Sequence, residues 1–374
     1  MVHTLLTSGY GNEVAALSFD PAAGSLTKTH TTQIANAPTW LTLSPTHDLA
    51  YTGAEFSEPD GVLTALSFDR ATGAVREVST ATVGAGPVHF ALSRDGTSLY
   101  SANYGSGSVS RVQLDADGTF VPGSSESLSF KGTGPNKARQ EAPHPHGVYV
   151  DPTGKYLLCA DLGTDVLRVF DVTSGAPVAL PSISLPPGNG PRHLLFAPPS
   201  AAAAASGKAL LYLIEELSNT IAVFEVEYPQ EGAEQPALSL NEIQREVSTL
   251  PPDAKDTPGD WTAAELAFSP CGRFLYASNR SPVDNPAAYD TLTVFSLAAS
   301  GALVVPPVRY VNLGGRGPRH FSLDPSGQFV AVALERTSEA VVYRIGEGTS
   351  KGDELVEVSR VKDVKQPTCI VWLS

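Results

Sequence analysis

PVHFALSRDGTSLY at 87–100 is the clearest copy of a phrase that returns along the whole chain, for example as PHGVYVDPTGKYL at 145–157 and PRHFSLDPSGQFV at 318–330. Each copy alternates apolar and polar residues, turns at a Gly- or Pro-containing segment, and alternates again, as half-buried strands do. The copies open at positions 38, 87, 145, 191, 263, 318 and 367. A repeat of roughly 40–50 residues made of short strands is typical of β-propellers. The seven openings therefore predict a seven-bladed β-propeller.

The repeat predicts an all-β fold with four-stranded antiparallel blades, in one domain over residues 1–374. The C-terminal TCIVWLS at 368–374 has the pattern of an inner strand but nothing after it to pair with. HTLLTSG at 3–9 and VAALSFD at 14–20 supply the missing strands, so we expect the last blade to be closed by both termini. Insertions at 199–208 and 227–261 interrupt the repeat and are expected to be surface loops, the second with a fourth strand at best.

Composition excludes several classes of function. The formal charge of −14 argues against nucleic acid and anionic membrane surfaces as partners. No run of 18 apolar residues is present, so no segment is expected to span a bilayer. The N-terminus lacks the pattern of a signal peptide. The odd number of cysteines at core-like places predicts reduced, buried thiols and a cytoplasmic protein, with the oligomeric state left open.

Polar residues gather where the inner strands of a propeller would line its central channel. The position after each opening holds Thr39, Val88, His146, Arg192, Ala264, Arg319 and Thr368. The next position holds Trp40, His89, Gly147, His193, Glu265, His320 and Cys369. A further set ends the following strand: Glu55, Asn103, Asp161, Glu216, Asn279 with Arg280, and Glu335 with Arg336. A purely structural channel would be filled by apolar or small side chains, so these rings predict a site.

Structural roles compete with this interpretation. Arg192–His193 and Arg319–His320 share one repeat position, which favours a structural role for at least one pair. Asp161 reads as the cap of a turn. The HPH sequence at 144–146 lacks the further residues of a metal set, so neither a metal nor a cofactor is expected. No nucleophile elbow, phosphate loop or dinucleotide fingerprint appears. The chemistry that these residues still allow is general acid–base catalysis on a small anion held by arginine.

Several longer stretches carry a family resemblance. They are EAPHPHGVYVDPTGKYLLCADLGTDVLRVF at 141–170, GPRHLLF at 190–196, LYLIEELSNTIAVF at 211–224, FLYASNR at 274–280 and GPRHFSLDPSGQFV at 317–330. Together they resemble the seven-bladed propeller lactonase family, which includes a bacterial type of 6-phosphogluconolactonase and the fungal 3-carboxy-cis,cis-muconate lactonizing enzyme. The resemblance implies a catalytic set of His146, Arg192, Glu216 and Arg280, although adjacent Glu215 leaves the alignment of the glutamate open by one residue.

The resemblance implies hydrolysis of a small sugar-acid lactone, such as 6-phosphogluconolactone, with Glu216 or His146 as general base. The residues expected to bind the substrate are His89, His193, Asn103, Asp161, Arg319 and Glu335. Two alternatives stay open at this point. One is a cycloisomerase that closes a muconate dicarboxylate to a lactone, because the same residues would serve it. The other is a propeller that acts only as a scaffold.

Overall fold

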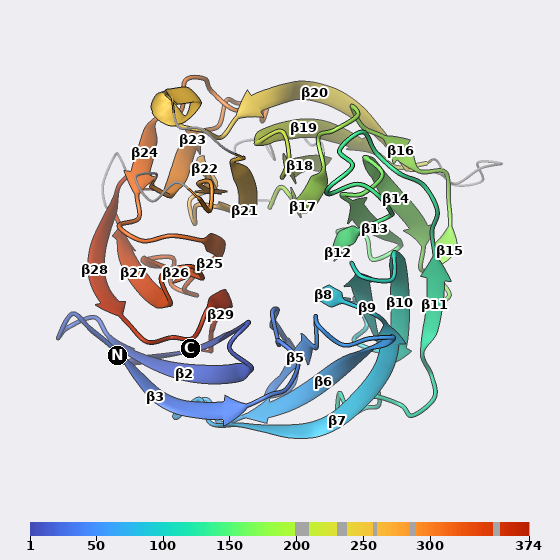
Figure 1. Cartoon of the computed structure of the whole chain (residues 1–374), viewed down its shortest axis with the longest axis horizontal. Helices are drawn as coiled ribbons and strands as arrows, with labels where there is room; N and C mark the ends of the chain where they lie inside the picture. Colours follow the sequence, from blue (N-terminus) through green and yellow to red (C-terminus); the bar gives the residue numbers. More distant parts are fainter. Residues whose placement is uncertain (199–208, 230–237, 257–259, 285–288, 347–351, 374) are drawn as a thin grey trace.

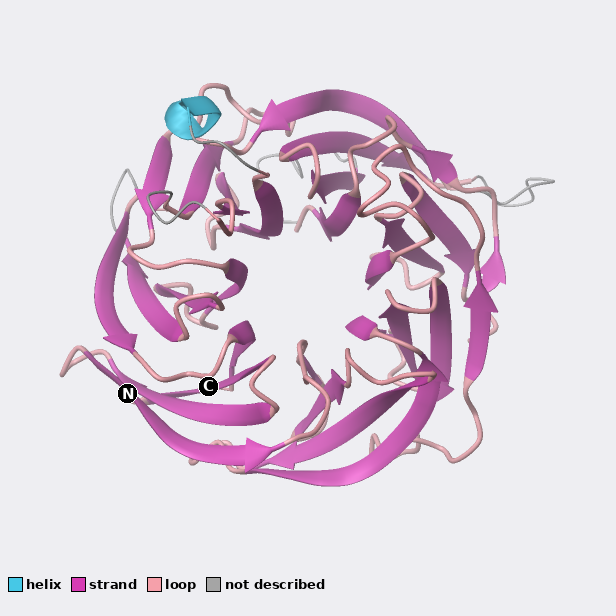
Figure 2. Cartoon of the chain, in the orientation of Figure 1, coloured by secondary structure: helices cyan, strands magenta, loops and turns pink. Residues whose placement is uncertain are grey.

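The computed structural model describes residues 1–198, 209–229, 238–256, 260–284, 289–346 and 352–373. Their strands form seven antiparallel sheets, which stand as blades around a central opening (Figures 1 and 2). Six sheets have four strands, and in the sheet of the third repeat the outermost strand is split into two short pieces. The all-β, seven-bladed propeller predicted from the repeat is therefore confirmed. A short 3-10 helix, Pro252–Asp256, follows the fourth repeat.

The strands of each blade are given from the central axis outwards. They are β4 (Thr42–Leu43), β5 (Leu49–Gly53), β6 (Asp60–Phe68), β7 (Val75–Gly84); β8 (Pro87–Leu92), β9 (Ser98–Asn103), β10 (Ser108–Gln113), β11 (Glu126–Ser129); β12 (Pro145–Val150), β13 (Tyr156–Asp161), β14 (Val166–Asp171), β15 (Val178–Ala179) with β16 (Ile183–Ser184); β17 (Pro191–Phe196), β18 (Ala209–Glu215), β19 (Thr220–Glu227), β20 (Ser239–Ser248); β21 (Thr262–Phe268), β22 (Phe274–Arg280), β23 (Thr291–Ser296), β24 (Arg309–Asn312); β25 (Pro318–Leu323), β26 (Phe329–Leu334), β27 (Glu339–Ile345), β28 (Leu355–Val361); and β29 (Pro367–Trp372), β1 (His3–Gly9), β2 (Glu13–Asp20), β3 (Ser25–Gln33).

The turn between the two inner strands explains the D-P-x-G part of the repeat. Asp151 accepts backbone hydrogen bonds from Lys155 at 3.0 Å and Tyr156 at 2.8 Å, while Gly154 adopts a positive φ of 77°. Asp324 caps the turn between β25 and β26 in the same way. A carboxylate acceptor and a residue that tolerates positive φ are what such a tight turn needs.

In four blades, a tyrosine on the second strand from the axis joins the blade to the next blade along the chain. The hydroxyls of Tyr51, Tyr100, Tyr212 and Tyr276 donate to the carbonyls of Gly118, Gly175, Gly301 and Gly352, at 2.6–2.8 Å. All four rings are buried, and each hydroxyl thereby keeps a partner inside an apolar interface. The apolar faces of neighbouring blades pack around them, so the core of the protein lies between the blades.

The blade that closes the ring contains both ends of the chain, as predicted (Figure 1). The C-terminal strand β29 is the innermost strand and pairs antiparallel with β1, Ile370 lying opposite Thr7 and Trp372 opposite Leu5. Two large apolar side chains of β29 are buried, at 0% exposure for Ile370 and 6% for Trp372. The ring is therefore held shut by strand pairing rather than by a loop.

Deletion of the last nine residues is expected to abolish folding, because it removes β29 whole. Truncating a buried Ile costs about 2–5 kcal/mol and a buried Trp about 3–5 kcal/mol, against a total stability of about 5–15 kcal/mol. The measurement is the yield and thermal melt of the purified truncated chain. Removal of Met1 and Val2, which are 95% and 53% exposed, is the control that should melt normally. An unchanged melting temperature after the C-terminal deletion would contradict this.

The two insertions interrupt the fourth blade. Residues 199–208 lie outside the described residues. The 227–261 segment contributes the outer strand β20 and the helix Pro252–Asp256, while 230–237 and 257–259 are also outside the described residues. The fourth strand expected in this segment is thus present.

Cysteine placement and membrane propensity bear on the predicted compartment. Cys159 and Cys369 are buried free thiols, but Cys271 is only partly buried, beside Ser269 in a surface turn, so the prediction of three buried thiols is wrong at this position. Across the described ranges, no helix has the length and apolar character that crossing a bilayer requires. A cytoplasmic location stays a prediction.

Candidate active site

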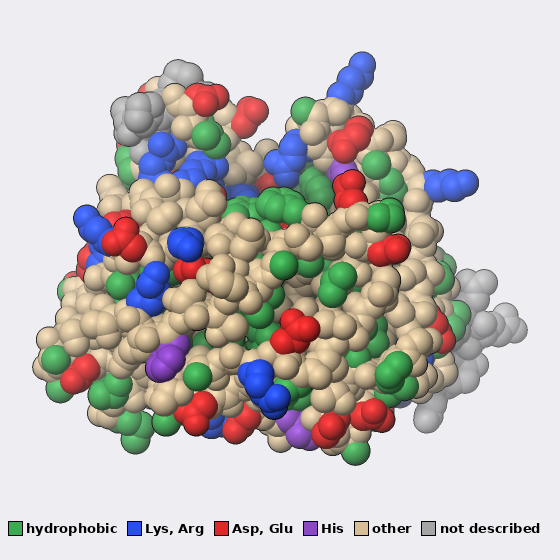
Figure 3. All heavy atoms as spheres, turned by 60° about the horizontal axis from the view of Figure 1, so that its bottom comes forward, with side chains coloured by type: hydrophobic (Ala, Val, Ile, Leu, Met, Phe, Trp, Pro, Cys, Tyr) green, Lys and Arg blue, Asp and Glu red, His purple; other side chains and the backbone are tan. Residues whose placement is uncertain are grey.

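A cavity of about 440 Å³ opens at one mouth of the central channel. Figure 3 shows this face of the molecule hollowed between two raised groups of loops, with Lys and Arg side chains beside the hollow. All seven blades contribute to the wall. The lining residues are Tyr10, Thr39, Trp40, Glu55, Val88, Tyr104, Arg139, His146, Arg192, His193, Glu216, Asp260, Thr262, Arg280, Val283, Arg319, Arg336 and Thr368.

A β-bulge at the start of the inner strands aims side chains into this cavity. In β8, β12, β17 and β25 the pairing register shifts directly after the opening proline. The residues at the shift are Val88, His146, Arg192 and Arg319, and all four line the cavity. A bulge leaves one residue unpaired and re-aims its side chain. Thr39 and Thr368 hold the same repeat position and line the cavity too, whereas Ala264 does not.

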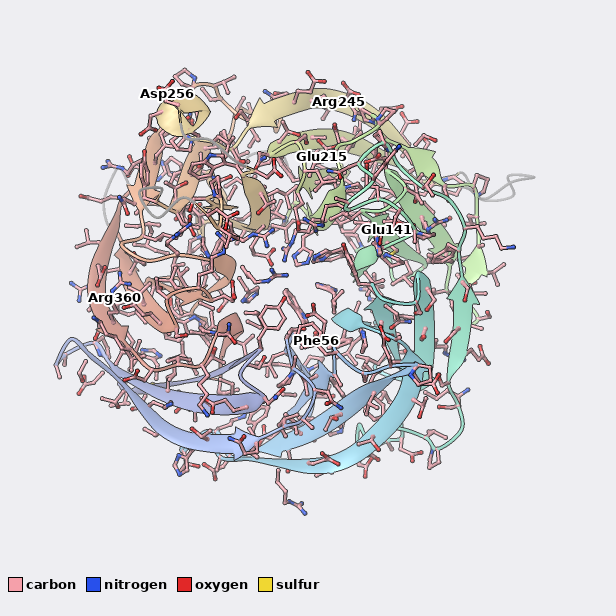
Figure 4. All side chains as sticks on the ribbon, viewed as in Figure 1. Phe56, Glu141, Glu215, Arg245, Asp256 and Arg360 are labelled. Carbon is pink, nitrogen blue, oxygen red and sulfur yellow. The ribbon has the colours of Figure 1, made fainter. Side chains whose placement is uncertain are left out.

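The second strands supply another ring, and of the residues predicted there Glu55, Glu216, Arg280 and Arg336 line the cavity. Asn103, Asp161 and Glu215 pair directly with the opening prolines of their blades. The residue that follows each partner position is the one able to face the channel, and Tyr104 and Glu216 do so. Of the two adjacent glutamates, Glu216 lines the cavity. Glu215 lies within its blade (Figure 4).

Glu216 stands at the centre of the charged wall. Its Oε1 lies 2.7 Å from Arg139 Nη2, and its Oε2 lies 2.9 Å from Arg192 Nε and 3.0 Å from Arg280 Nη2. The backbone fixes two of these arginines, because Arg192 donates to the Ala264 carbonyl at 2.5 Å and Arg280 to the Ala263 carbonyl at 2.9 Å. The carboxylate side chain is only 3% exposed. One buried carboxylate therefore organises three guanidinium groups.

The protonation of this cluster follows from its charges. Burial disfavours the ionised form of Glu216, but Arg280, Arg139 and Arg192 outweigh it and hold the pKa of that carboxyl well below its usual range. Burial also lowers the pKa of Arg280 to about 9, against the opposing effect of Glu216. Both groups are charged at neutral pH. Glu216 is therefore a weak proton acceptor, and its role is to hold the arginines.

His146 is the candidate base that remains. Its Nε2 lies 3.9 Å from Glu216 Oε2, and its Nδ1 is buried without a hydrogen-bond partner among the described residues. Burial, with the charge of Arg192, holds the pKa of His146 well below its usual value. The imidazole is thus neutral at neutral pH and has a lone pair available. Of the two bases that the sequence left open, the geometry favours His146.

A layer of aromatic rings forms the floor beneath the charged wall. Trp40 lies 4.4 Å from His89, 5.2 Å from His193 and 4.8 Å from His320, measured between ring centroids. The Nδ1 atom of His193 lies 2.9 Å from Glu265 Oε2. These residues come from the repeat position two after each opening, which therefore closes the channel below the cavity. The layer separates the cavity from the rest of the channel.

The structure divides the other predicted substrate-binding residues into two groups. His193 and Arg319 line the cavity. His89 and Asn103 do not: His89 Nδ1 accepts the Val148 amide in the floor, and Asn103 is held by hydroxyls of its own blade. Neither side chain is therefore placed to contact a substrate bound in this cavity.

Asp161 and Glu335 also lie outside the cavity lining. Asp161 Oδ1 accepts the amides of His144 and Gly163, and its Oδ2 pairs with Arg168 at 2.5 Å, as the turn-capping interpretation expects. Glu335 stands behind the lining residue Arg336, its Oε2 3.9 Å from the guanidinium. Their carboxylates interact with residues that form the walls of the site, so neither is placed to contact a bound substrate directly.

Six lining residues were not singled out from the sequence: Tyr10, Tyr104, Arg139, Asp260, Thr262 and Val283. Arg139 comes from the 130–144 loop, which lies outside the repeat and is anchored by the fully buried Gln140, whose amide donates to the Leu162 carbonyl at 2.8 Å. Tyr104 and Tyr10 were missed for another reason. Each directly follows the residue that pairs with an opening proline, the position that Glu216 also holds. Aligning the repeats on that pairing would have identified both tyrosines.

The charges of the lining residues determine what the cavity can accept. Five arginines and three carboxylates line it, so its wall is net positive in a chain of net charge −14. Guanidinium groups bind carboxylates and phosphates strongly, and the effect grows where water is excluded. Within the described part of the chain, no group of three or more His, Cys, Asp or Glu residues is placed to hold a metal ion. The arrangement suits an anion held beside a neutral imidazole.

The sequence and the fold of the chain are similar to those of known proteins. The family model described as "Lactonase, 7-bladed beta-propeller" matches residues 2–372. The chain is 30% identical to a protein of Arthroderma benhamiae named "Probable 6-phosphogluconolactonase", over 96% of this chain and 86% of that protein. It is 30% identical to the 6-phosphogluconolactonase of Bacillus subtilis over 76% and 72%. The solved structure of the periplasmic gluconolactonase PpgL of Pseudomonas aeruginosa superposes with a TM-score of 0.81 at 27% identity, covering 100% of this chain and 99% of that one.

Proposed function

Because the chain belongs to the family of seven-bladed β-propeller lactonases, we propose that it hydrolyses the ring ester of a sugar-acid lactone, with 6-phosphogluconolactone as the first candidate. The observation that carries the proposal is the neutral His146 beside the Glu216 cluster of three arginines. Two relatives whose names specify 6-phosphogluconolactonase support the choice of substrate. The net positive wall supports a substrate that carries a phosphate or carboxylate.

In the first step, His146 Nε2 takes a proton from a water molecule as its oxygen attacks the lactone carbonyl carbon. The carbonyl π electrons move onto oxygen, and the oxyanion is stabilised by the guanidinium groups of Arg192 and Arg280. A positioned proton acceptor contributes about 10²–10⁴-fold to the rate. That contribution is sufficient, because such lactones already open slowly in water.

In the second step, the tetrahedral intermediate collapses and the bond from carbonyl carbon to ring oxygen breaks. The ring oxygen takes the proton that His146 received, so the imidazole returns to its neutral form. The product is a hydroxy acid that ionises at neutral pH and releases one proton to solvent. Arg319 lines the same cavity, with its guanidinium carbon 5.5 Å from the centre of the Tyr10 ring and without an ion pair among the described residues, and it would hold the substrate's distal anion.

The test is a pH-stat assay of the purified protein with 6-phosphogluconolactone, gluconolactone and other aldonolactones. Acid release above the spontaneous rate is expected, with kcat/KM about tenfold or more higher for the phosphorylated lactone. One charge-assisted hydrogen bond contributes about 1.5–3 kcal/mol, and 1.4 kcal/mol is tenfold. Heat-denatured protein is the blank. Equal rates for both lactones would refute a phosphate contact.

The two other functions that the sequence left open become outcomes of the same assay. A cycloisomerase would release no acid from lactones but would remove the ultraviolet absorbance of a muconate dicarboxylate, which the positive cavity would also accept. A scaffold would do neither. Either outcome would overturn the proposed hydrolysis.

A further inference from the structure

Below the charged wall, Glu265 and His193 are aligned behind His146, and we propose that they are positioning residues that fix the ring orientation and tautomer of the catalytic imidazole. The inference rests on the proposed function, in which His146 Nε2 accepts a proton. It goes beyond that function by placing a buried carboxylate–imidazole pair behind the base. Neither Glu265 nor its contact with His193 touches the cavity mouth where substrate would enter.

The first contact of this series joins Glu265 to His193. Glu265 Oε2 lies 2.9 Å from His193 Nδ1, and both side chains are buried, at 8% and 1% exposure. The other oxygen, Oε1, accepts the Leu266 amide at 3.0 Å, so the carboxylate cannot rotate freely. Arg192 Nη1 lies 3.3 Å from the same Nδ1, but the contact with the carboxylate is shorter. When Nδ1 donates to Glu265, a neutral imidazole carries its lone pair on Nε2. The acceptor of His193 is thereby placed on the side of the ring away from Glu265.

The second contact joins the rings of His193 and His146. Their centroids are 5.1 Å apart and their planes cross at 70°. His193 Nε2 and His146 Nδ1 are both buried, and neither has a hydrogen-bond partner among the described residues. Buried polar atoms without partners are costly, and two in adjoining rings satisfy each other directly after a small ring rotation, or through one water. A donor on His146 Nδ1 and an acceptor on His193 Nε2 complete this pairing.

Gly147 shows how closely the two strands approach at this point. A Cβ atom built on Gly147 would lie 2.7 Å from the Arg192 carbonyl oxygen and 3.2 Å from Cδ2 of His193. The Cδ2–Nε2 edge of the His193 ring therefore packs against the residue that follows His146. Glycine is required here, because any side chain would push the two strands and the two imidazoles apart.

The consequence for the base is a fixed tautomer. With Nδ1 of His146 donating to His193, the lone pair must be on Nε2, the atom that lies 3.9 Å from Glu216 Oε2. Burial raises the pKa of Glu265. In its ionised form the carboxylate favours the imidazolium that forms when His146 accepts a proton, as carboxylates behind catalytic histidines do elsewhere. Other charged or titratable groups that act on His146 are Arg192, Arg319, His193 and Glu216. Those that act on Glu265 are His320 and Arg192.

The direct test uses the wild-type protein labelled with ¹⁵N-histidine and needs no substrate. Nitrogen chemical shifts are expected to show His146 protonated on Nδ1, with its resonance identified by its loss in His146→Ala. In Glu265→Gln the preference is expected to weaken to a mixture of tautomers. Protonation of His146 on Nε2 in the wild type would overturn the proposal, whether or not the variant folds.

Kinetics with the lactone that the wild type hydrolyses provides the second readout. Glu265→Gln is expected to lower kcat by about 10–100-fold with KM within about twofold, and to move the acid limb of the kcat/KM profile to lower pH. Glu265→Asp should restore part of kcat. The matched control is Glu215→Gln, another buried carboxylate, whose Oε2 accepts from Thr220 at 2.7 Å and which does not line the cavity.

The two levels of inference fail differently. A wild type that hydrolyses no lactone, yet shows the Nδ1-protonated tautomer and its loss in Glu265→Gln, would reject the proposed function while the ring arrangement stands. An active wild type whose pH profile and kcat are unchanged in Glu265→Gln would reject the role of Glu265 alone.

Discussion

His146→Ala is expected to lower kcat for lactone hydrolysis by about 10²–10⁴-fold while the melting temperature changes little. Removal of the side chain affects the contact with His193 proposed above, and the ion pairs of Glu216 with the three arginines stay intact. The arginines that would hold the substrate stay in place, and KM is expected to change less than kcat. The measurement is steady-state kinetics in the pH-stat with a parallel thermal melt.

The pH dependence provides an independent check on the same residue. Because burial and Arg192 hold the pKa of His146 below its usual value of about 6.5, the base is unprotonated across neutral pH. Activity should therefore fall only as pH drops through that lowered pKa, and the residual activity of His146→Ala should lack this limb. His30→Ala, on the exposed outer strand β3, is the control. Full activity in His146→Ala would remove it from the site.

Glu216→Gln is expected to destabilise the protein by about 3–5 kcal/mol as well as to abolish activity. The substitution removes the negative charge that lies within 3.0 Å of Arg139, Arg192 and Arg280, and two of these guanidinium groups are buried. Breaking a buried ion pair from one side leaves uncompensated charge and costs about this much. Urea unfolding measures it.

The sign of the pH effect follows from the lowered pKa of Glu216. Its stabilising contribution is complete above the unfolded value of about 4.3 and is lost as pH falls through the lower folded value. The wild type and Glu216→Gln should thus differ most at neutral pH and converge in acid. Added inorganic phosphate should stabilise the variant more than the wild type. Glu55→Gln, in the same wall but 3.4 Å from a single hydroxyl, is the matched control and should lose less than about 1 kcal/mol. Equal stability of wild type and Glu216→Gln would contradict the ion-pair cluster.

The repeat allowed the blades, the closure by both termini and most of the cavity wall to be predicted, since each depends on local strand pattern. What the repeat could not predict also depends on local structure, namely the pairing register. Asn103 and Asp161 end strands equivalent to the one that precedes Glu216, but both pair with the opening proline of their blade, whereas Glu216 lies one residue further on. A count along the sequence does not reveal that offset, because it depends on the pairing register.

Arg139 shows a second limit. It lies in a loop outside the repeat and reaches Glu216, 77 residues further along the chain, across the mouth of the channel. No periodicity encodes such a contact, which arises from the path of the loop and the anchoring of Gln140. The charge state of Glu216 was also inaccessible, because it depends on three arginines that come together only in the folded ring.

Because of the bulge after the opening proline of β8, β12, β17 and β25, the lining of the cavity and the packing of the blades depend on different residues. The residue at the bulge faces the cavity, while the strand on either side of it keeps its pairing and its place between the blades. Four such positions, Val88, His146, Arg192 and Arg319, surround one opening, and an exchange at any of them alters the chemistry of the cavity without altering the packing that holds the ring together. A propeller of this kind can acquire a new substrate by point mutation, so descent from a common ancestor guarantees the architecture of its members far more firmly than their specificity.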